Sequence, residues 1–300
     1  MSDVLAAAQI VDLPRIPIGQ WAEGLVDWLD QNVGLGLELI DDAVRNSFDG
    51  ILALLTWAPA EVMILLFTIL AFVVRGWGFA LFALLGIGFV ESMGRFEPMM
   101  QTTALIIVAS AIAIVISIPV GILAARSVGV SRVVRPILDL MQTMPPFVYL
   151  IPTVFFFSIG ATPGVVATVV FALPPGVRLT ELGIRQVDAE MVEAGQAFGA
   201  PPRQILSGIQ LPLAMPSIMA GVNQVIMLSL SMVVIAGMVG APGLGQSVYE
   251  AVTRVQIGAG AEAGLSVVIL AIFVDRLTSA FGAGKGIWSR LRASPSMASQ

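Results

Sequence analysis

Side chains that usually carry catalysis are scarce in this sequence. Its 300 residues include no cysteine and no histidine, which removes thiolate nucleophiles, disulfides, the commonest general base and the commonest metal ligand. Lys285 is the single lysine, so carboxylates and two tyrosines are the main groups left for acid–base chemistry. They form no paired catalytic motif. We therefore expect a chain that is not an enzyme and that holds neither a metal nor a cofactor of its own.

Residues 282–286, Gly-Ala-Gly-Lys-Gly, come nearest to a phosphate-binding loop. The motif fails at both ends, because Ser279 stands in place of its first glycine and Gly286 in place of the Ser or Thr that binds magnesium. We interpret the segment as the exit from the last helix into a cytoplasmic tail, residues 283–300. ATP and magnesium would then bind to a partner chain rather than to this one.

Polar side chains interrupt two apolar segments near the C-terminus. Asp275 and Arg276 lie in the last segment, where ionisable groups are costly and usually paired. We favour a structural ion pair near the membrane surface, with a part in conformational coupling as the alternative. Asn223 and Gln224 lie in the preceding segment and should face either a partner helix, which we favour, or a solute path.

The composition sets the class of protein that must position these groups. The chain is 57% hydrophobic and 12% charged, against about 25% charged in an average soluble domain, and its mean hydropathy is +0.93. A soluble core of this size could not hide so much apolar surface, so lipid must solvate much of it. The isoelectric point near 4.8 argues against a nucleic-acid partner. We predict an all-α membrane protein in contact with lipid.

Seven apolar segments are candidates for membrane-spanning helices, within a transmembrane domain over residues 59–282. The first two are short and are separated by Arg75 and Gly76, so they form either two tilted helices or one re-entrant pair. The third is long enough to cross a hydrocarbon core of about 30 Å. In chain order the seven are Pro59–Val74, Trp77–Val90, Thr103–Ala125, Pro145–Ile159, Gly164–Leu179, Pro216–Val239 and Ala261–Phe281.

Residues 1–58 differ from these segments in pattern. Their beginning lacks the basic and apolar regions of a cleavable signal peptide. Further on, apolar residues recur every three or four positions, and acidic residues occupy the opposite face. Trp21 and Trp28 on the apolar face suit the boundary between lipid and water, so we predict an external amphipathic segment lying at the interface. An amphipathic helix packed on protein is the alternative.

The basic residues indicate an orientation. With the C-terminus in the cytoplasm, the cytoplasmic segments hold 11 of the 15 basic residues, in agreement with the positive-inside rule. Seven spans then place the N-terminus outside, where its nine acidic and two basic residues fit. A re-entrant pair in place of the first two spans would leave the N-terminus outside as well.

The long polar loop over residues 181–215 is cytoplasmic in this orientation. Asp188 can cap a helix, and Gly199 can end it because glycine accepts the left-handed conformation. Pro202 suits the first turn of a second helix, which we expect to end at Pro212 before the next span. The pattern predicts a helix–turn–helix.

This loop resembles the EAA loop of permeases from ATP-binding-cassette (ABC) importers. The match is Glu-Ala-Gly, three residues, Gly, nine residues, Ile-x-Leu-Pro, with glycine at position 195 where the family usually has alanine. The family implies that the two short helices sit in a cleft of an ATP-binding subunit, with Glu193 as a charged contact. The residues assigned to this coupling site are Glu193, Ala194, Gly195, Gly199, Ile209, Leu211 and Pro212.

Other segments, from about residue 16 to residue 281, are similar to the proline/glycine betaine permease group of binding-protein-dependent inner-membrane components. They are residues 16–28, 142–152, 171–180, 211–224, 230–236 and 269–278. The resemblance implies a type I ABC importer permease in the bacterial cytoplasmic (inner) membrane, with two copies of the chain around one pathway. It also implies two ATP-binding subunits and an external substrate-binding protein. The implied solute is glycine betaine or proline betaine, with choline, carnitine and trimethylamine N-oxide as relatives.

A candidate solute pathway follows from the polar and aromatic groups of the fourth to sixth segments. Prolines there free backbone carbonyls, which are tolerated where they face water or protein. Aromatic rings attract quaternary ammonium groups by about 0.5–2 kcal/mol each. Contact with lipid or core is the alternative role for such side chains. The pathway residues are Phe147, Tyr149, Asn223, Gln224 and Ser231.

An ion-coupled secondary transporter or channel for small solutes is the alternative function. It would need charged residues deep in its spans, and only Asp275 and Arg276 qualify. It would also leave the 181–215 loop without a role. We therefore predict a permease subunit that imports an osmolyte with energy from a separate ATPase.

Overall fold

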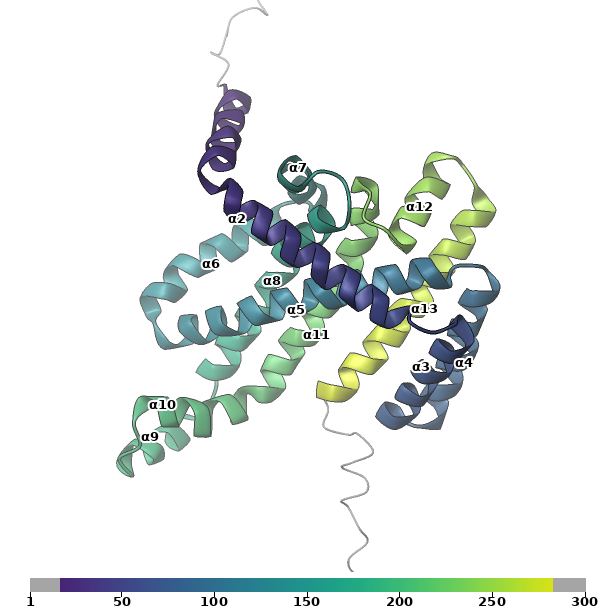
Figure 1. The fold of residues 1–300 in the computed structure, drawn as a ribbon. Helices are drawn as coiled ribbons and strands as arrows, with labels where there is room; N and C mark the ends of the chain where they lie inside the picture. Colours follow the sequence, from purple (N-terminus) through teal and green to yellow (C-terminus); the bar gives the residue numbers. More distant parts are fainter. Residues whose placement is uncertain (1–16, 283–300) are drawn as a thin grey trace, which may run out of the picture. The chain divides into compact units, whose positions relative to one another are not determined.

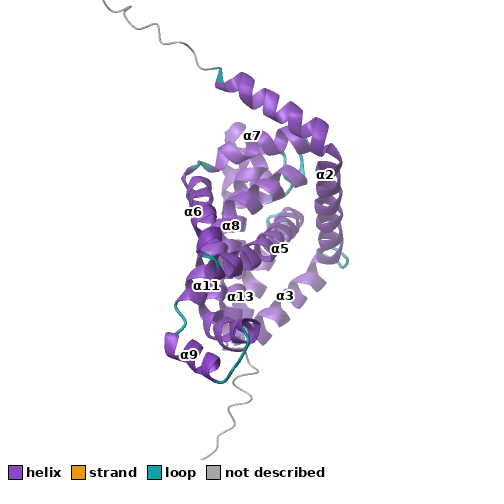
Figure 2. Cartoon of the chain, turned by 90° about the vertical axis from the view of Figure 1, so that its left-hand side faces the viewer, coloured by secondary structure: helices purple, strands orange, loops and turns teal. Residues whose placement is uncertain are grey.

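The computed structural model of the chain describes residues 17–282, and all regular structure in this range is helical (Figure 1; Figure 2). Our predictions for residues 1–16 and 283–300 lie outside the described residues. Within the described range, the chain divides at residue 40 into two compact units, residues 17–40 and 41–282. The helices are α2 (Ile18–Leu55), α3 (Ala60–Arg75), α4 (Trp77–Ser92), α5 (Phe96–Arg126), α6 (Val128–Thr143), α7 (Pro146–Phe157), α8 (Ala161–Arg185), α9 (Ala189–Ala197), α10 (Pro202–Ile205), α11 (Leu211–Ala236), α12 (Leu244–Thr253) and α13 (Ile257–Gly282), with a π-helical turn at Leu206–Gln210 and a 3-10 turn at Gly237–Val239.

Each of the seven predicted apolar segments lies in a helix, but not every helix can cross a membrane alone. Four are long and apolar enough: α5, α8, α13 and the continuous helix Pro202–Val239 that contains α11. Two further candidates are bent pairs, with 93° between α2 and α3 and 99° between α6 and α7. α4 has 16 residues, or about 24 Å of helix. The described chain thus has four to six candidate spans, fewer than the seven predicted.

The fourth predicted span, Pro145–Ile159, is corrected by the structure. α7 has 12 residues, about 18 Å of helix, which is too short for a core of about 30 Å. The residues before it, which lie outside the predicted spans, form the helix α6, and the two helices qualify only together, as a broken span or a re-entrant loop. The break falls at Met144, which is extended, because a proline disfavours helical conformation in the residue before it.

α2 continues across the boundary between the two compact units. In the second unit, Val44, Phe48 and Leu55 are buried in the main core, on the apolar face that their spacing predicts. In the first unit, Trp21 and Trp28 are 64% and 56% exposed. Residues 41–55 of α2 thus belong to the second compact unit, and the predicted division after residue 58 stays a prediction. The interfacial position of the two indoles stays a prediction.

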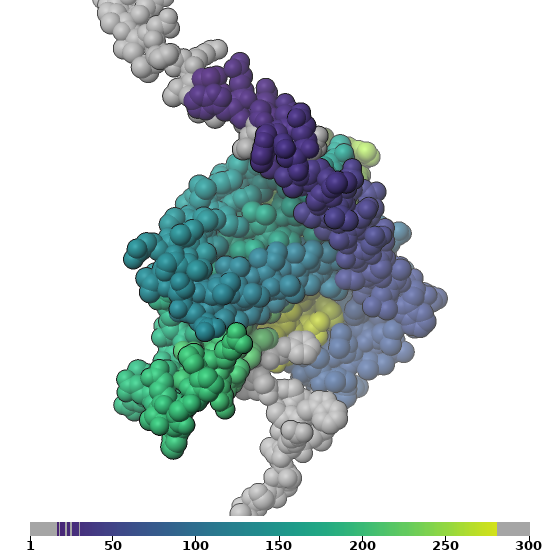
Figure 3. All heavy atoms as spheres, turned by 60° about the vertical axis from the view of Figure 1, so that its left-hand side comes forward, coloured from purple at the N-terminus to yellow at the C-terminus, as the bar shows by residue number. Residues whose placement is uncertain are grey.

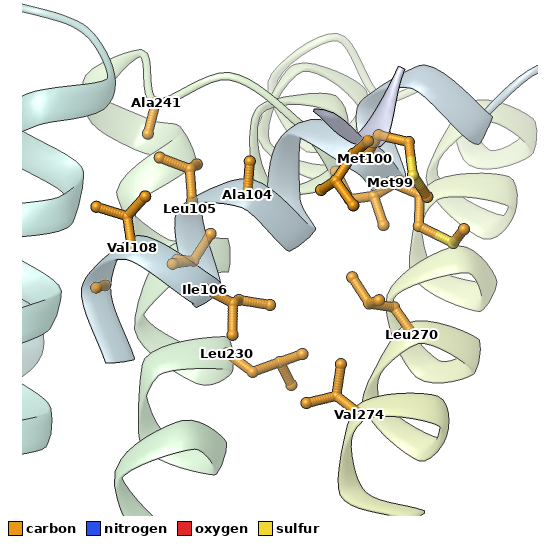
Figure 4. Packing of buried hydrophobic residues seen from close by; sticks show 14 of the residues in the cluster. Met99, Met100, Ala104, Leu105, Ile106, Val108, Leu230, Ala241, Leu270 and Val274 are labelled. Atoms are coloured by element: carbon orange, nitrogen blue, oxygen red, sulfur yellow. The ribbon is translucent and has the colours of Figure 1, made fainter. Parts of the chain in front are cut away.

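The core of the second unit is built around α5, α8 and α11. Figure 4 shows side chains of α5 facing those of α11 and α13. Small residues allow close approach: a Cβ on Gly121 would lie 2.6 Å from Cβ of Thr180, and a Cβ on Gly183 would lie 2.7 Å from Cβ of Ser217. Lipid is as apolar as leucine, so helices in a membrane associate largely through such tight packing.

A glycine-rich loop fixes the end of α11. A Cβ on Gly237 would lie 2.2 Å from the carbonyl carbon of Gly245, so two backbones meet here. Gly243 has φ +121° and lies against Thr102 of α5, whose Oγ1 accepts a hydrogen bond from the N–H of Leu244 at 2.8 Å. The loop therefore ties α11 to α5. The sequence analysis identified neither this loop nor α12, which follows it.

Candidate functional site

The loop between α8 and α11 folds as a helix–turn–helix. Asp188 caps α9, because its Oδ1 accepts a hydrogen bond from the N–H of Glu190 at 3.1 Å. The helix ends at Gly199, which is left-handed with φ +77°. The N–H of Ala200 donates to the carbonyl of Gly195 at 3.1 Å, the bond of a Schellman turn. The capping and turn residues read from the sequence thus have the predicted conformations.

The second arm begins at Pro202 but does not end at Pro212. α10 passes through the π-helical turn directly into α11, so the helix is continuous from Pro202 to Val239. The π-turn shifts the hydrogen-bond pattern just before Pro212, whose nitrogen has no hydrogen to donate, so the proline does not break the helix. A movement of this arm would therefore be passed directly into a membrane span.

The inner side of the motif is formed by small and aliphatic residues. A Cβ on Gly195 would lie 2.8 Å from Cδ1 of Ile209, so the glycine lets α9 lie directly on the second arm. An alanine here would require the isoleucine side chain to shift. Ile205 is buried, and Leu211 packs against a smaller core cluster formed by α8 and α11.

The outer side of the motif is open. No residue of α9 is buried, and Glu193, Ala194 and Pro212 are exposed. Phe198 at the turn is 93% exposed. Figure 3 shows this segment, in green, standing out from the helices beside it. Exposure of a phenyl ring costs free energy that a partner would recover by covering it, so the motif has the form of a docking element.

A buried charge cluster lies at the end of α8, just before α9. The Glu181 carboxylate is 4% exposed, and its Oε1 accepts hydrogen bonds from Ser131 at 2.7 Å and Arg135 at 3.0 Å and lies 3.0 Å from Nε of Arg185. Arg185 also donates to the carbonyl of Ala124 at 2.9 Å. The cluster joins the ends of α5, α6 and α8. The sequence analysis missed it, although the i,i+4 spacing of the glutamate and Arg185 was an available signal.

Two of the five predicted pathway residues lie in contacts between helices. Tyr149 is buried, and its hydroxyl donates to the backbone carbonyl of Met141 across the bend between α6 and α7. Asn223 accepts a hydrogen bond from the hydroxyl of Thr278 of α13 at 2.6 Å. Within one chain these two side chains hold helices together, the role that we favoured for Asn223.

The other three predicted pathway residues are exposed. Phe147 on α7 is 51% exposed, and Gln224 and Ser231 are exposed on α11. The last two are seven residues apart, so they lie on one face of the helix. A polar face on an apolar span requires protein or water beside it rather than lipid.

Asp275 and Arg276 do not form the predicted ion pair. Neighbouring residues on a helix point about 100° apart, and neither residue is in a salt bridge with any part of the chain that the structure describes. Instead, the carbonyl of Arg276 accepts a hydrogen bond from Arg75 of α3 at 3.4 Å. The two residues therefore face different surroundings.

Long apolar helices, one of them continuous with an exposed helix–turn–helix, have the form of a multi-pass membrane protein. The family model for "Binding-protein-dependent transport system inner membrane component" matches residues 117–285. The chain belongs to this family, whose members are multi-pass inner-membrane proteins.

Three relatives are similar over most of the chain. The glycine betaine transport system permease protein OpuAB of Bacillus subtilis is 49% identical over 266 residues, which cover 89% of this chain and 94% of the relative. The glycine betaine/proline betaine permease protein ProW of Escherichia coli is 46% identical, and the match covers 89% of this chain and 75% of the relative. The glycine betaine/carnitine permease protein GbuB of Listeria monocytogenes is 46% identical, and the match covers 90% of this chain and 97% of the relative.

A solved structure supports the fold. The MetNI methionine ABC transporter in an inward-facing conformation matches with a TM-score of 0.57 and 24% identity, over 61% of this chain and 92% of the matched chain. The predicted all-α fold of a type I importer permease is confirmed.

The turn of the coupling motif gives a first prediction. Gly199→Val places a β-branched side chain at φ +77°, a strain of about 1–3 kcal/mol. We expect the variant to insert in the membrane in normal amount and to lose most of its binding to the ATP-binding subunit and most of its coupled uptake. Co-purification and uptake assays measure both.

Gly199→Asn is the matched control for this prediction, because asparagine tolerates the left-handed region. It should retain most of both activities. Normal uptake by inserted Gly199→Val protein would show that the turn is not needed for coupling.

Proposed function

We propose that this chain is the permease subunit of an ATP-driven importer and that α9 and α10 couple it to a separate ATP-binding subunit. The exposed motif carries this proposal, since Phe198 and Glu193 have nothing covering them among residues 17–282. The helix that starts in the motif runs on into the bundle. ATP and magnesium bind on the partner, and this chain converts the partner's movement into a movement of α11.

The solute that we propose is glycine betaine, proline betaine or a similar small methylated osmolyte. The names of three relatives that are 46–49% identical support this class. The exposed rings of Phe147 and Phe155 on α7 have the chemistry to attract a quaternary ammonium group. Carnitine, choline and trimethylamine N-oxide belong to the same chemical class.

We further propose that two copies of the chain enclose the pathway. Gln224 and Ser231 lie on an exposed face of α11 in a single chain, and a second copy would shield that face from lipid. An external binding protein would deliver the solute to the opening between the copies, and two ATP-binding subunits would engage the two coupling motifs.

The orientation that we propose has the N-terminus outside and the C-terminus in the cytoplasm. Arg185 at the end of α8 donates a hydrogen bond to the end of α5. Thr278, near the end of α13, donates one to Asn223, and Arg75 at the end of α3 donates one to the carbonyl of Arg276. These contacts bring the ends of α3, α5, α8 and α13 to one side of the bundle, together with the coupling motif. Most arginines of the described chain lie on this side, which supports a cytoplasmic position.

The test is uptake of labelled glycine betaine into vesicles that contain the chain, its ATP-binding subunit and its binding protein. We expect uptake to require ATP hydrolysis and to persist when ionophores collapse all ion gradients. Uptake driven by a sodium or proton gradient without the ATPase would favour the ion-coupled alternative. The polar face of α11 supports the first outcome, because this helix has no charged residue.

A cysteine scan tests the pathway, and the native chain contributes no background thiol. We expect cysteines at Phe147, Gln224 and Ser231 to react with small charged reagents, with rates that change when the ATPase is trapped with ATP. A cysteine at Val115, exposed on α5, is the control. If the control reacts as fast as the three test sites, or if nucleotide changes none of them, the assignment of the pathway is wrong.

A further inference from the structure

Two arginines from distant parts of the chain line one cavity at the ends of α3 and α13. Arg75 ends α3, and its Nη1 lies 3.4 Å from the carbonyl of Arg276 and 3.3 Å from Oγ of Ser279. The cavity has a volume of about 510 Å³. Its lining is Arg75, Gly78, Phe79, Phe82, Ile272 and Arg276.

The charge in this cavity is not compensated within the described chain. Of the eleven arginines between residues 17 and 282, five lie 3.1 Å or less from a carboxylate oxygen and six, Arg75 and Arg276 among them, do not. Neither Arg75 nor Arg276 has such a partner in that range. Two guanidinium groups beside one cavity repel each other, and an anion between them would relieve the repulsion. Guanidinium binds phosphate oxygens in a bidentate manner.

The remaining walls are apolar and adjoin an exposed apolar surface. Phe79, Phe82 and Ile272 line the cavity. The adjoining face of α3 exposes Ile69, Phe72 and other large apolar side chains, which acyl chains must cover in a membrane. Inorganic phosphate would gain no binding free energy from apolar walls. A phospholipid would place its headgroup at the two arginines and its acyl chains along the rings of Phe79 and Phe82.

We propose that this cavity binds the headgroup of an anionic phospholipid, with the phosphate between Arg75 and Arg276. The bound lipid would join the hairpin of α3 and α4 to the end of α13. Basic pockets between membrane helices commonly hold anionic headgroups in this way. The site involves neither the solute nor the coupling motif, so this proposal is tested separately from the proposed function.

The test uses the full-length chain in a neutral detergent with dioleoyl phosphatidylglycerol as the probe and dioleoyl phosphatidylcholine as the comparison. Native mass spectrometry gives the lipid-bound fraction. We expect phosphatidylglycerol to be retained in preference to phosphatidylcholine. Arg75→Gln with Arg276→Gln should weaken its retention roughly fivefold for each charge removed.

Two further variants separate a lipid site from general surface charge. Gly78→Leu keeps both charges and should fill the cavity; a Cβ at this position meets nothing within 4 Å, so the fold should tolerate it. It should lose phosphatidylglycerol as the double variant does. Arg132→Gln removes an exposed arginine of α6 and should change nothing.

Three outcomes would overturn the proposal. They are equal retention of the two lipids by the wild type, full retention of phosphatidylglycerol by the double glutamine variant, and displacement of the lipid by glycerol phosphate at equal concentration. The last outcome would assign the site to a free anion. A purely structural role for Arg75, in capping α13 through the carbonyl of Arg276, predicts the first outcome.

Discussion

Glu181→Ala is expected to destabilise the protein by about 3 kcal/mol, because it removes the buried member of an ion cluster and leaves its partners unpaired. The carboxylate is 4% exposed and faces both Arg135 and Arg185. Its removal also leaves the hydroxyl of Ser131, a buried residue, without its acceptor. The value lies at the low end for a broken buried pair because both arginines are partly exposed, at 59% and 35%.

Thermal unfolding of the purified chain in detergent measures this effect, and Asp139→Asn is the matched control. Asp139 pairs with Arg178 one turn along the same two helices, but their side chains are 65% and 40% exposed. Exposed pairs contribute about 0–1 kcal/mol, so the control should melt close to the wild type. Equal melting temperatures for the two variants would show that the Glu181 cluster is not a stabilising element.

The same cluster lies where the coupling motif joins the bundle. Arg185 ends α8, and α9 begins at Ala189. If the end of α8 loses its ionic link to α6, α9 has a less rigid base from which to move the second arm. We therefore expect Glu181→Ala to lower uptake per ATP hydrolysed even in protein that remains folded at the assay temperature.

The coupling motif was predictable from sequence because its conformation is set locally. Asp188, Gly199 and Pro202 each act within one turn of helix, through a cap, a left-handed residue and a fixed φ. The error at Pro212 has a local cause too. A proline in a helix is normally a stop, and the π-turn that accommodates it leaves no trace in the pattern of apolar residues.

The parts that the sequence did not reveal depend on contacts between distant segments. α6 was not predicted as part of a span, and Arg135 on this helix is positioned by Glu181, 46 residues further on. Arg276 was paired with its neighbour, whereas the structure sets it beside Arg75, 201 residues away. Residue spacing shows which side chains share one face of a helix. Which other helix that face contacts is determined only when the helices pack together.

Gly237→Ala is expected to have the other large effect. The added Cβ would lie 2.2 Å from the carbonyl carbon of Gly245 and 2.3 Å from the backbone nitrogen of Gln246. Backbone atoms cannot turn aside as the end of a side chain can, so the loop must move away from α11. Overpacking typically costs about 1–3 kcal/mol, and a clash with backbone belongs at the upper end of that range. We expect a loss of folded protein in detergent, measured by size-exclusion chromatography and thermal unfolding.

Gly264→Ala in α13 is the control, because a Cβ there meets nothing within 4 Å and alanine favours a helix by about 0.5–1 kcal/mol. It should be neutral or stabilising. The comparison isolates the close backbone contact from the change of residue type. Gly237 lies at the end of the helix that begins in the coupling motif, and Leu244 ties the adjoining loop to Thr102 of α5. A Gly237→Ala variant that folds and transports normally would show that the C-terminal end of α11 need not be fixed.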